Sequence, residues 1–99
     1  MFNPSPKIKT FRSWQYLDWI ASQPCIISGF KPQARDQWND PCHIGFGAKP
    51  DDTRAIPMQH KYHIELHQIG EKTFAKKYNI DFQEEIIKHL TEYMAFIGE

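Results

Sequence analysis

Two short segments of this 99-residue chain carry residues that can bind a metal ion and move protons. His63 and His67 stand four residues apart, so on a helix their imidazoles project from one face and can share one cation. About twenty residues earlier, the segment Asp40-Pro41-Cys42-His43 offers a carboxylate, a thiol and another imidazole. A ligand pair with a further donor and a general base predicts a metal-dependent catalytic site.

The elements that must position these residues are a helix and a hairpin. The pattern becomes helical from about Gln59 to His67 or Gln68, and Gly70 just beyond is the expected stop. Short apolar segments around 42–44 and near 55–56 predict two strands. The loop between them contains glycines and a proline, so these strands are expected to form a β-hairpin with a long connection.

Further helices are expected on either side of this core. Ser13 can cap a short helix that ends before Pro24 and carries the apolar residues Trp14, Leu17 and Ile20. Asp81 and Glu84 form a capping-box-like start to a final helix. Its apolar face is expected to be Phe82, Ile86, Ile87, Leu90, Tyr93, Met94 and Ile97. His89 lies off that face and is predicted to be an exposed surface residue.

Length and composition indicate one small domain over residues 13–99, preceded by an extended basic arm over residues 1–12. Three Trp, seven Phe and four Tyr predict an aromatic-rich core. No apolar run approaches the ~20 residues of a membrane span, and the first residues lack the apolar stretch of a secretion signal. We therefore expect a cytoplasmic protein with no membrane contact, in which Cys25 and Cys42 are thiols.

Charge balances over the whole chain, with 12 basic and 12 acidic residues, but it is unevenly distributed. Residues 1–77 hold 11 basic and 7 acidic side chains, a balance of +4, whereas residues 78–99 hold 1 and 5, a balance of −4. This asymmetry is either chance segregation or an arrangement in which one surface approaches a polyanion and the final helix faces away.

The order strand, loop, returning strand and helix with His-x3-His resembles the HNH endonuclease superfamily, and within it a phage and prophage branch that includes recombination-enhancement nucleases. The segments that carry the resemblance are Asp40-Pro41-Cys42-His43-Ile44, Lys49-Pro50-Asp51-Asp52, Ile56-Pro57-Met58-Gln59 and His63 to His67. The resemblance spans roughly residues 13–82. It implies an α+β fold with a ββα-metal core and flanking N- and C-terminal helices.

The implied activity is that of a divalent-metal-dependent DNA endonuclease or nicking nuclease. By this resemblance His43 is the general base, His63 and His67 bind the cation, and Asp52 supports the site by tying the loop to the strand. The third ligand is either Cys42, directly before the base, or Asp40. A thiolate would favour Zn²⁺, whereas a carboxylate would also suit Mg²⁺ or Mn²⁺.

Many relatives also hold a structural zinc, for which the matching positions here are Cys25, Ser28, Gln59 and Tyr62. Only one of the four retains a zinc-binding side chain, so no structural zinc is expected. The hypothesis is that aromatic packing replaces it, with Trp14, Tyr62 and Phe74 as the residues concerned.

DNA is the expected partner, and basic side chains supply the phosphate contacts. These are Lys49, Arg54 and the arm residues Lys7, Lys9 and Arg12, with His60 as a further contact, an extra ligand or a solvated residue at the helix start. A protein partner in recombination or phage replication is a further expectation, and the sequence makes no prediction of oligomeric state.

Other chemistries fit less well. A zinc protease of the His-Glu-x-x-His type needs Glu directly after the first His, and Ile64 stands there. Cys42 acting as a nucleophile with His43 is disfavoured, because adjacent strand residues point to opposite sides. Two rivals from other classes stay open. One is a non-catalytic, metal-stabilised nucleic-acid-binding module derived from such a nuclease, and the other is an accessory protein whose acidic final helix contacts a partner.

Overall fold

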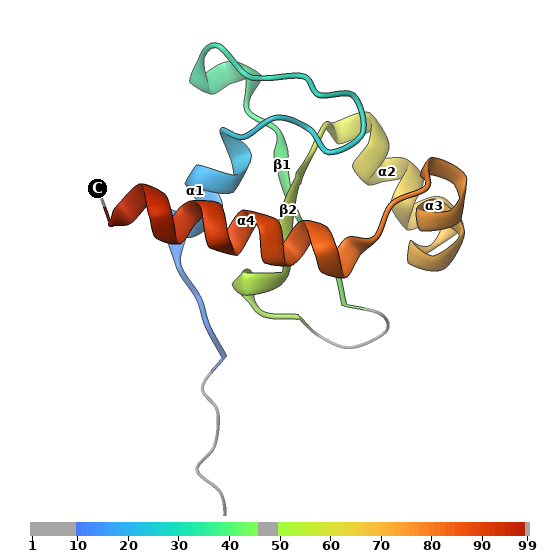
Figure 1. The fold of residues 1–99 in the computed structure, drawn as a ribbon. Helices are drawn as coiled ribbons and strands as arrows, with labels where there is room; N and C mark the ends of the chain where they lie inside the picture. Colours follow the sequence, from blue (N-terminus) through green and yellow to red (C-terminus); the bar gives the residue numbers. More distant parts are fainter. Residues whose placement is uncertain (1–9, 46–49, 99) are drawn as a thin grey trace, which may run out of the picture.

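A two-stranded antiparallel sheet lies at the centre of four helices in the computed structural model, which describes residues 10–45 and 50–98 (Figure 1). In chain order the elements are α1 (Trp14–Ala21), β1 (Asp40–His43), β2 (Ala55–Met58), α2 (His60–Ile69), α3 (Glu71–Tyr78) and α4 (Phe82–Ile97). Two short 3-10 helices, Arg35–Gln37 and Asp52–Arg54, precede β1 and β2. The fold is therefore a small α+β domain, as expected.

The register of the hairpin determines which side chains of β1 face which helix. Asp40 pairs with Met58, and His43 pairs with Ala55. Because side chains alternate along a strand, Asp40 and Cys42 share one face, and Pro41 and His43 share the other. The strand begins two residues before the predicted segment 42–44, and β2 confirms the strand predicted near 55–56.

The predicted helix boundaries are confirmed where a cap defines them. Ser13 Oγ accepts a hydrogen bond from the backbone N–H of Tyr16 at 3.1 Å, so α1 begins at Trp14. Asp81 caps α4 by accepting the N–H of Glu84. α2 ends at Ile69, directly before Gly70, whose φ of +87° lies in the region that favours glycine, so the chain turns there into α3.

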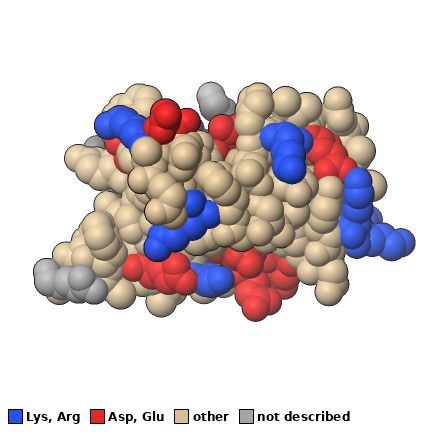
Figure 2. All heavy atoms as spheres, turned by 90° about the horizontal axis from the view of Figure 1, so that it is seen from above, with Lys and Arg blue, Asp and Glu red and all other residues tan. Residues whose placement is uncertain are grey.

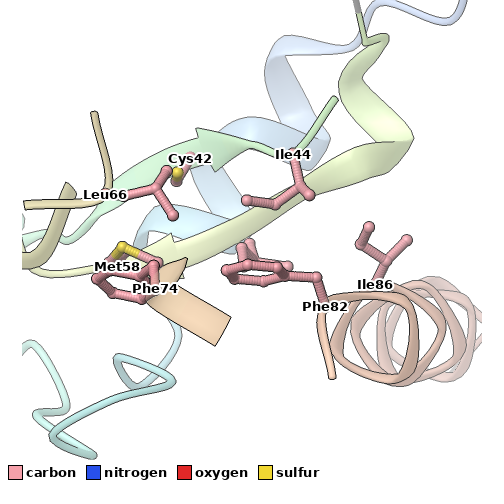
Figure 3. Packing of buried hydrophobic residues seen from close by; sticks show 8 residues of the cluster. Cys42, Ile44, Met58, Leu66, Phe74, Phe82 and Ile86 are labelled. Carbon is pink, nitrogen blue, oxygen red and sulfur yellow. The ribbon is translucent and has the colours of Figure 1, made fainter. Parts of the chain in front are cut away.

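The main core lies between the hairpin and helices α2, α3 and α4, and mixes aliphatic with aromatic side chains (Figure 3). Its buried members are Cys42, Ile44, Ile56, Met58, Leu66, Phe74, Phe82 and Ile86. A second, smaller cluster of Tyr16, Ile20 and Ala55 joins α1 to β2. Tyr93 of α4 closes this cluster with an edge-on contact to Tyr16 at 4.8 Å between ring centroids.

The predicted apolar faces of the outer helices are partly wrong. In α1 the buried residues are Tyr16, Ile20 and Ala21, whereas Trp14 is 81% exposed. In α4 the side chains of Ile87, Met94 and Ile97 are exposed. The apolar stripe of α4 is therefore wider than the part of the helix that packs against β2, α1 and the 3-10 helix Asp52–Arg54.

His89 is also placed differently from the prediction, because it is buried at 4% exposure. Its Nδ1 donates a hydrogen bond to the backbone oxygen of Glu85 at 2.7 Å, and its ring lies edge-on to Trp19 of α1. The internal hydrogen bond satisfies the imidazole, which allows α1 to pack over this position of α4.

Neighbouring isoleucines in α4 give a matched test of this packing. Ile86→Ala is expected to lower the free energy of unfolding by about 2–5 kcal/mol, because Ile86 fills the main core. Ile87→Ala, at a position 62% exposed, is expected to change it by no more than about 0.5 kcal/mol. Urea unfolding followed by circular dichroism measures both, and equal losses would contradict the placement of α4.

The hydroxyl of Tyr16 gives a second test. It is buried without a hydrogen-bond partner among the described residues, and burial together with Tyr93 raises the pKa of Tyr16 to about 12. Tyr16→Phe removes that unsatisfied group and keeps the ring contacts. We expect thermal unfolding to show that the variant is as stable as the wild type or more stable, with a gain of up to roughly 1 kcal/mol. A clear loss would show that the hydroxyl has a partner.

Candidate functional site

A carboxylate and three imidazoles meet where β1 lies beside α2. Asp40 Oδ2 lies 2.7 Å from His60 Nδ1 and 3.0 Å from His63 Nδ1. His63 Nε2 in turn lies 3.1 Å from His67 Nε2. The hairpin register supplies this arrangement, because Asp40 pairs with Met58, two residues before α2 begins.

The protonation of this cluster follows from its hydrogen bonds. Burial opposes ionisation of Asp40, but hydrogen bonds from His60 and His63 outweigh it and lower the pKa of Asp40. An ionised carboxylate accepts hydrogen bonds and donates none, so in both contacts with Asp40 the hydrogen lies on Nδ1 of the histidine. A neutral His63 therefore directs the lone pair of Nε2 toward His67.

Two sets of these atoms fit a divalent ion. Asp40, His60 and His63 offer one donor atom each, and these atoms lie within 4.8 Å of one another. Alternatively, the Nε2 atoms of His63 and His67 are close enough to share an ion at bond lengths of about 2.0–2.1 Å. Asp40 is then the outer carboxylate that orients His63, an arrangement common around histidine ligands. Imidazole nitrogen and carboxylate oxygen are both ordinary zinc ligands, so the donor chemistry fits.

Cys42 lies apart from this cluster, in the main core. Its side chain is fully buried beside Leu66 and Ile44 (Figure 3). Burial raises the pKa of the Cys42 thiol to about 12, and the carboxylates of Glu71 and Asp40 act in the same direction. Of the two alternatives for the third donor, the structure thus places Asp40, and not Cys42, with the histidines.

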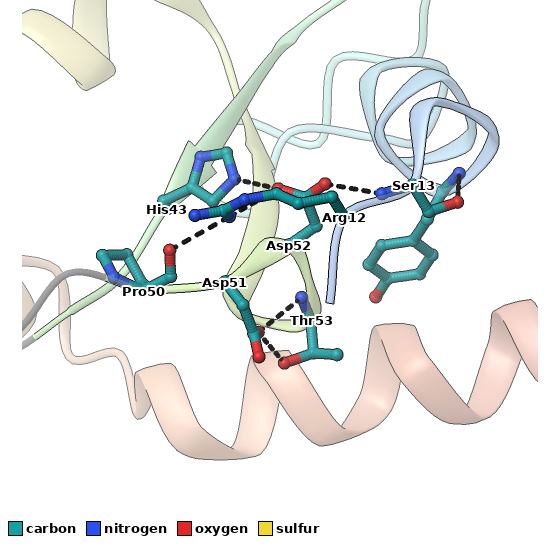
Figure 4. Close-up of polar contacts among 8 residues, drawn as sticks. Arg12, Ser13, His43, Pro50, Asp51, Asp52 and Thr53 are labelled. Carbon is teal, nitrogen blue, oxygen red and sulfur yellow. Dashed lines mark hydrogen bonds and ion pairs between the residues drawn. The ribbon is translucent and has the colours of Figure 1, made fainter. Parts of the chain in front are cut away.

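His43 and Asp52 form a second polar group (Figure 4). His43 Nε2 lies 2.9 Å from Asp52 Oδ1. Asp52 also accepts the backbone N–H of Ser13 at 2.7 Å and an Nη1 hydrogen of Arg12 at 3.2 Å. Burial opposes the charge on Asp52, but these donors outweigh it and lower the pKa of Asp52. The buried carboxylate joins β1, the following loop and the start of α1.

This pairing suits His43 for proton transfer. Asp52 accepts the proton on Nε2, which leaves Nδ1 as the basic nitrogen of a neutral ring. The side chain of His43 is 32% exposed, while that of Asp52 is 5% exposed. A partly exposed imidazole held by a buried carboxylate is the arrangement of an oriented general base.

The two polar groups lie on opposite faces of β1. Asp40 faces α2, whereas His43 faces the start of α1, as the alternation of strand side chains requires. Within the described ranges, no hydrogen bond or ion pair links His43 to His60, His63 or His67. The predicted site residues thus form two hydrogen-bonded groups, one around Asp40 and one around Asp52, on opposite faces of β1.

The basic residues expected to contact DNA have different surroundings. Arg54 Nε donates to the backbone oxygen of Ile44 at 2.7 Å and so braces the hairpin. Arg12, predicted as part of an extended basic arm, binds Asp52 and the backbone oxygen of Pro50. No local pattern signals this pairing, because the partners stand forty residues apart. Lys7, Lys9 and Lys49 lie outside the described residues. Figure 2 shows acidic and basic side chains interspersed on the face seen from above.

The four positions considered above for a structural zinc, Cys25, Ser28, Gln59 and Tyr62, lie close together. Cys25 Sγ accepts the backbone N–H of Gln59 at 3.3 Å, and Ser28 hydrogen-bonds the side chain of Gln59. Tyr62 packs edge-on against Tyr78 at 5.8 Å, and Tyr78 contacts Phe74. Hydrogen bonds and aromatic packing thus connect these segments. The exposed Trp14 takes no part, contrary to the prediction for that residue.

Comparison with known families matches residues 1–98 to DUF968, described as a protein of unknown function, and the chain belongs to that family. Over 72 residues it is 31% identical to the uncharacterized protein YdfU of Escherichia coli strain K12. The match covers 67% of this chain and 19% of that protein, so the chain spans about a fifth of its curated relative. No solved structure matches the chain. None of the helices in the described ranges combines the length and apolar character needed to cross a membrane.

The charge of Asp52 predicts a pH-dependent stability. Asp52→Asn is expected to lower the free energy of unfolding by about 1–3 kcal/mol near pH 7, because three donors lose a charged acceptor. The folded pKa lies below the unfolded value of about 3.9, so this stabilisation is complete above that value and is lost as pH falls through the folded pKa.

Urea unfolding of wild type and variant at several pH values measures this effect. The difference between the two should shrink below roughly pH 4. Asp18→Asn, which changes an exposed carboxylate on α1, is the control and should show little difference at any pH. A constant difference for Asp52→Asn down to the lowest pH would contradict the assignment.

Proposed function

We propose that this chain is a divalent-metal-dependent nuclease of the HNH type, acting on the phosphodiester bonds of DNA. The observation that carries the proposal is the contact of Asp40 in β1 with His63 in α2, with His67 one turn further along. A hairpin followed by a helix that presents paired histidines beside a strand carboxylate is the order expected of the ββα-metal core. Family membership leaves the activity open, since DUF968 is described as of unknown function.

Each residue has a defined task in this proposal. His63 binds the ion either together with Asp40 and His60 or together with His67, and in the second case Asp40 orients the ring of His63. A divalent cation bound there would supply positive charge that stabilises a phosphate oxygen and the leaving oxygen. His43 accepts a proton from the attacking water through Nδ1, and Asp52 holds the ring in position. Arg12 reinforces the charge of Asp52 and lies where a phosphate can meet it.

Zinc titration of single variants tests the metal site. His63→Ala is expected to cause the largest loss of affinity, and Asp40→Asn a loss of roughly 10–100-fold. Comparing His60→Ala with His67→Ala decides which of the two atom sets binds the ion. Cys42→Ala is the matched control and should change the affinity less than about twofold, because its thiol is in the core. Calorimetry with Zn²⁺ and Mn²⁺ measures the wild type and all five variants, and equal affinities throughout would refute a site here.

Nicking of supercoiled plasmid tests the chemistry. With Mg²⁺, Mn²⁺ or Zn²⁺ present, His43→Ala is expected to lower the cleavage rate by roughly 10²–10⁴-fold while metal affinity stays nearly constant. His63→Ala is expected to lose both cleavage and metal binding. Cleavage by His43→Ala at the wild-type rate would exclude His43 as the base.

One observation favours a second candidate, a non-catalytic metal-stabilised module that binds nucleic acid. His43 and the ligand cluster lie on opposite faces of β1, and hydrolysis requires a phosphate to reach both. A mobility shift that weakens steeply with salt, in the absence of cleavage with any of the three metals, would select this module.

A further inference from the structure

A cavity of about 430 Å³ lies beside the His43–Asp52 pair, at the start of α1. Trp14 and Leu17, one helical turn apart, provide its apolar wall. Its polar part consists of Arg12, Ser13, His43 and Asp52. The cavity thus combines a flat aromatic surface, a cation and a hydrogen-bonding group within one opening.

Trp14 differs from the other two tryptophans of the chain in its surroundings. Trp19 packs within the aromatic cluster around Tyr93, and Trp38 lies under the guanidinium of Arg35 at 4.8 Å. Trp14 is 81% exposed, and none of the ring contacts within the described ranges involves it. An indole left this exposed at the rim of a cavity is available to a planar ligand.

The position of Trp14 is nevertheless well defined, because the residue before it is held twice. Ser13 caps α1 through its side chain, and its backbone N–H binds the buried Asp52 at 2.7 Å. Arg12 is half exposed, and within residues 10–45 and 50–98 its hydrogen bonds to Asp52 and Pro50 both come from Nη1. Its Nε and Nη2 donors thus remain to meet an anion beside the indole.

We infer that this cavity binds an unpaired nucleobase, stacked on Trp14, with the adjoining phosphate at Arg12. The inference rests on the proposed function in taking nucleic acid as the ligand. A base has flat apolar faces and a polar edge, which match the indole wall and the polar groups around His43. Bases within a duplex are already stacked on both faces, so the ligand is a single-stranded or unpaired segment.

Binding of a labelled oligothymidine of about twelve nucleotides, followed by fluorescence anisotropy in EDTA, tests the inference without any need for cleavage. Trp14→Ala is expected to weaken binding about tenfold, and Trp14→Phe to restore most of the loss. An abasic strand of the same length should bind wild type and Trp14→Ala equally, because it lacks the stacking group. Trp38→Ala is the matched control, since Trp38 lies outside the cavity lining.

The possible results separate this inference from the proposed nuclease. Two results would overturn the stacking site even if the plasmid is nicked. One is equal affinity of wild type and Trp14→Ala for the oligothymidine. The other is a loss of affinity in Trp14→Ala that is as large for duplex DNA and the abasic strand as for the oligothymidine. A loss confined to unpaired bases would support it even if no metal yields cleavage. Failure of the wild type to bind any strand would overturn it together with the role of DNA.

Discussion

The register between β1 and β2 is the constraint on which the rest of this structure depends. Pairing Asp40 with Met58 brings the carboxylate next to the start of α2, where His60 and His63 meet it. The same pairing directs Cys42 into the core and His43 to the opposite face. A shift of one residue would exchange the two faces of β1, turning Asp40 away from α2 and Cys42 away from the core and bringing Pro41 and His43 there instead. The main core, which includes both Cys42 and Ile56, therefore holds both polar groups in place.

Asp52 is the second point of organisation, because one buried carboxylate joins three separate segments. It binds the backbone before α1, the side chain of Arg12 and the ring of His43. A buried, unpaired carboxylate destabilises the folded state, and it is tolerated only when its oxygens accept hydrogen bonds. The arrangement accounts for the position of α1 against the hairpin and for the orientation of His43. It also explains why a residue of the presumed arm, Arg12, belongs structurally to the domain.

The two polar groups on the opposite faces of β1 have different roles in the proposed function. The cluster around Asp40 has the donor atoms for a divalent ion, and the group around Asp52 holds the imidazole of His43 beside a cavity with an exposed indole. Hydrolysis as proposed requires one phosphate to reach both groups, and a flexible single strand can adapt to that requirement more easily than a stiff duplex. The proposed nuclease and the proposed base-stacking site are compatible on this ground, and each has its own readout.

Local signals in the sequence determined most of the elements. The caps at Ser13 and Asp81, the stop at Gly70 and the apolar segments of the hairpin act through neighbouring residues, so their effects can be read from spacing. The i, i+4 spacing of His63 and His67 likewise placed them on one helix face. Only the tertiary structure decided which faces are buried: His89 is covered while Ile87 is exposed, because packing area on α4 depends on where α1 lies. It also decided that Asp40 meets the histidines and that Arg12 meets Asp52, because these contacts join segments that are distant in sequence and close only once the hairpin register is formed.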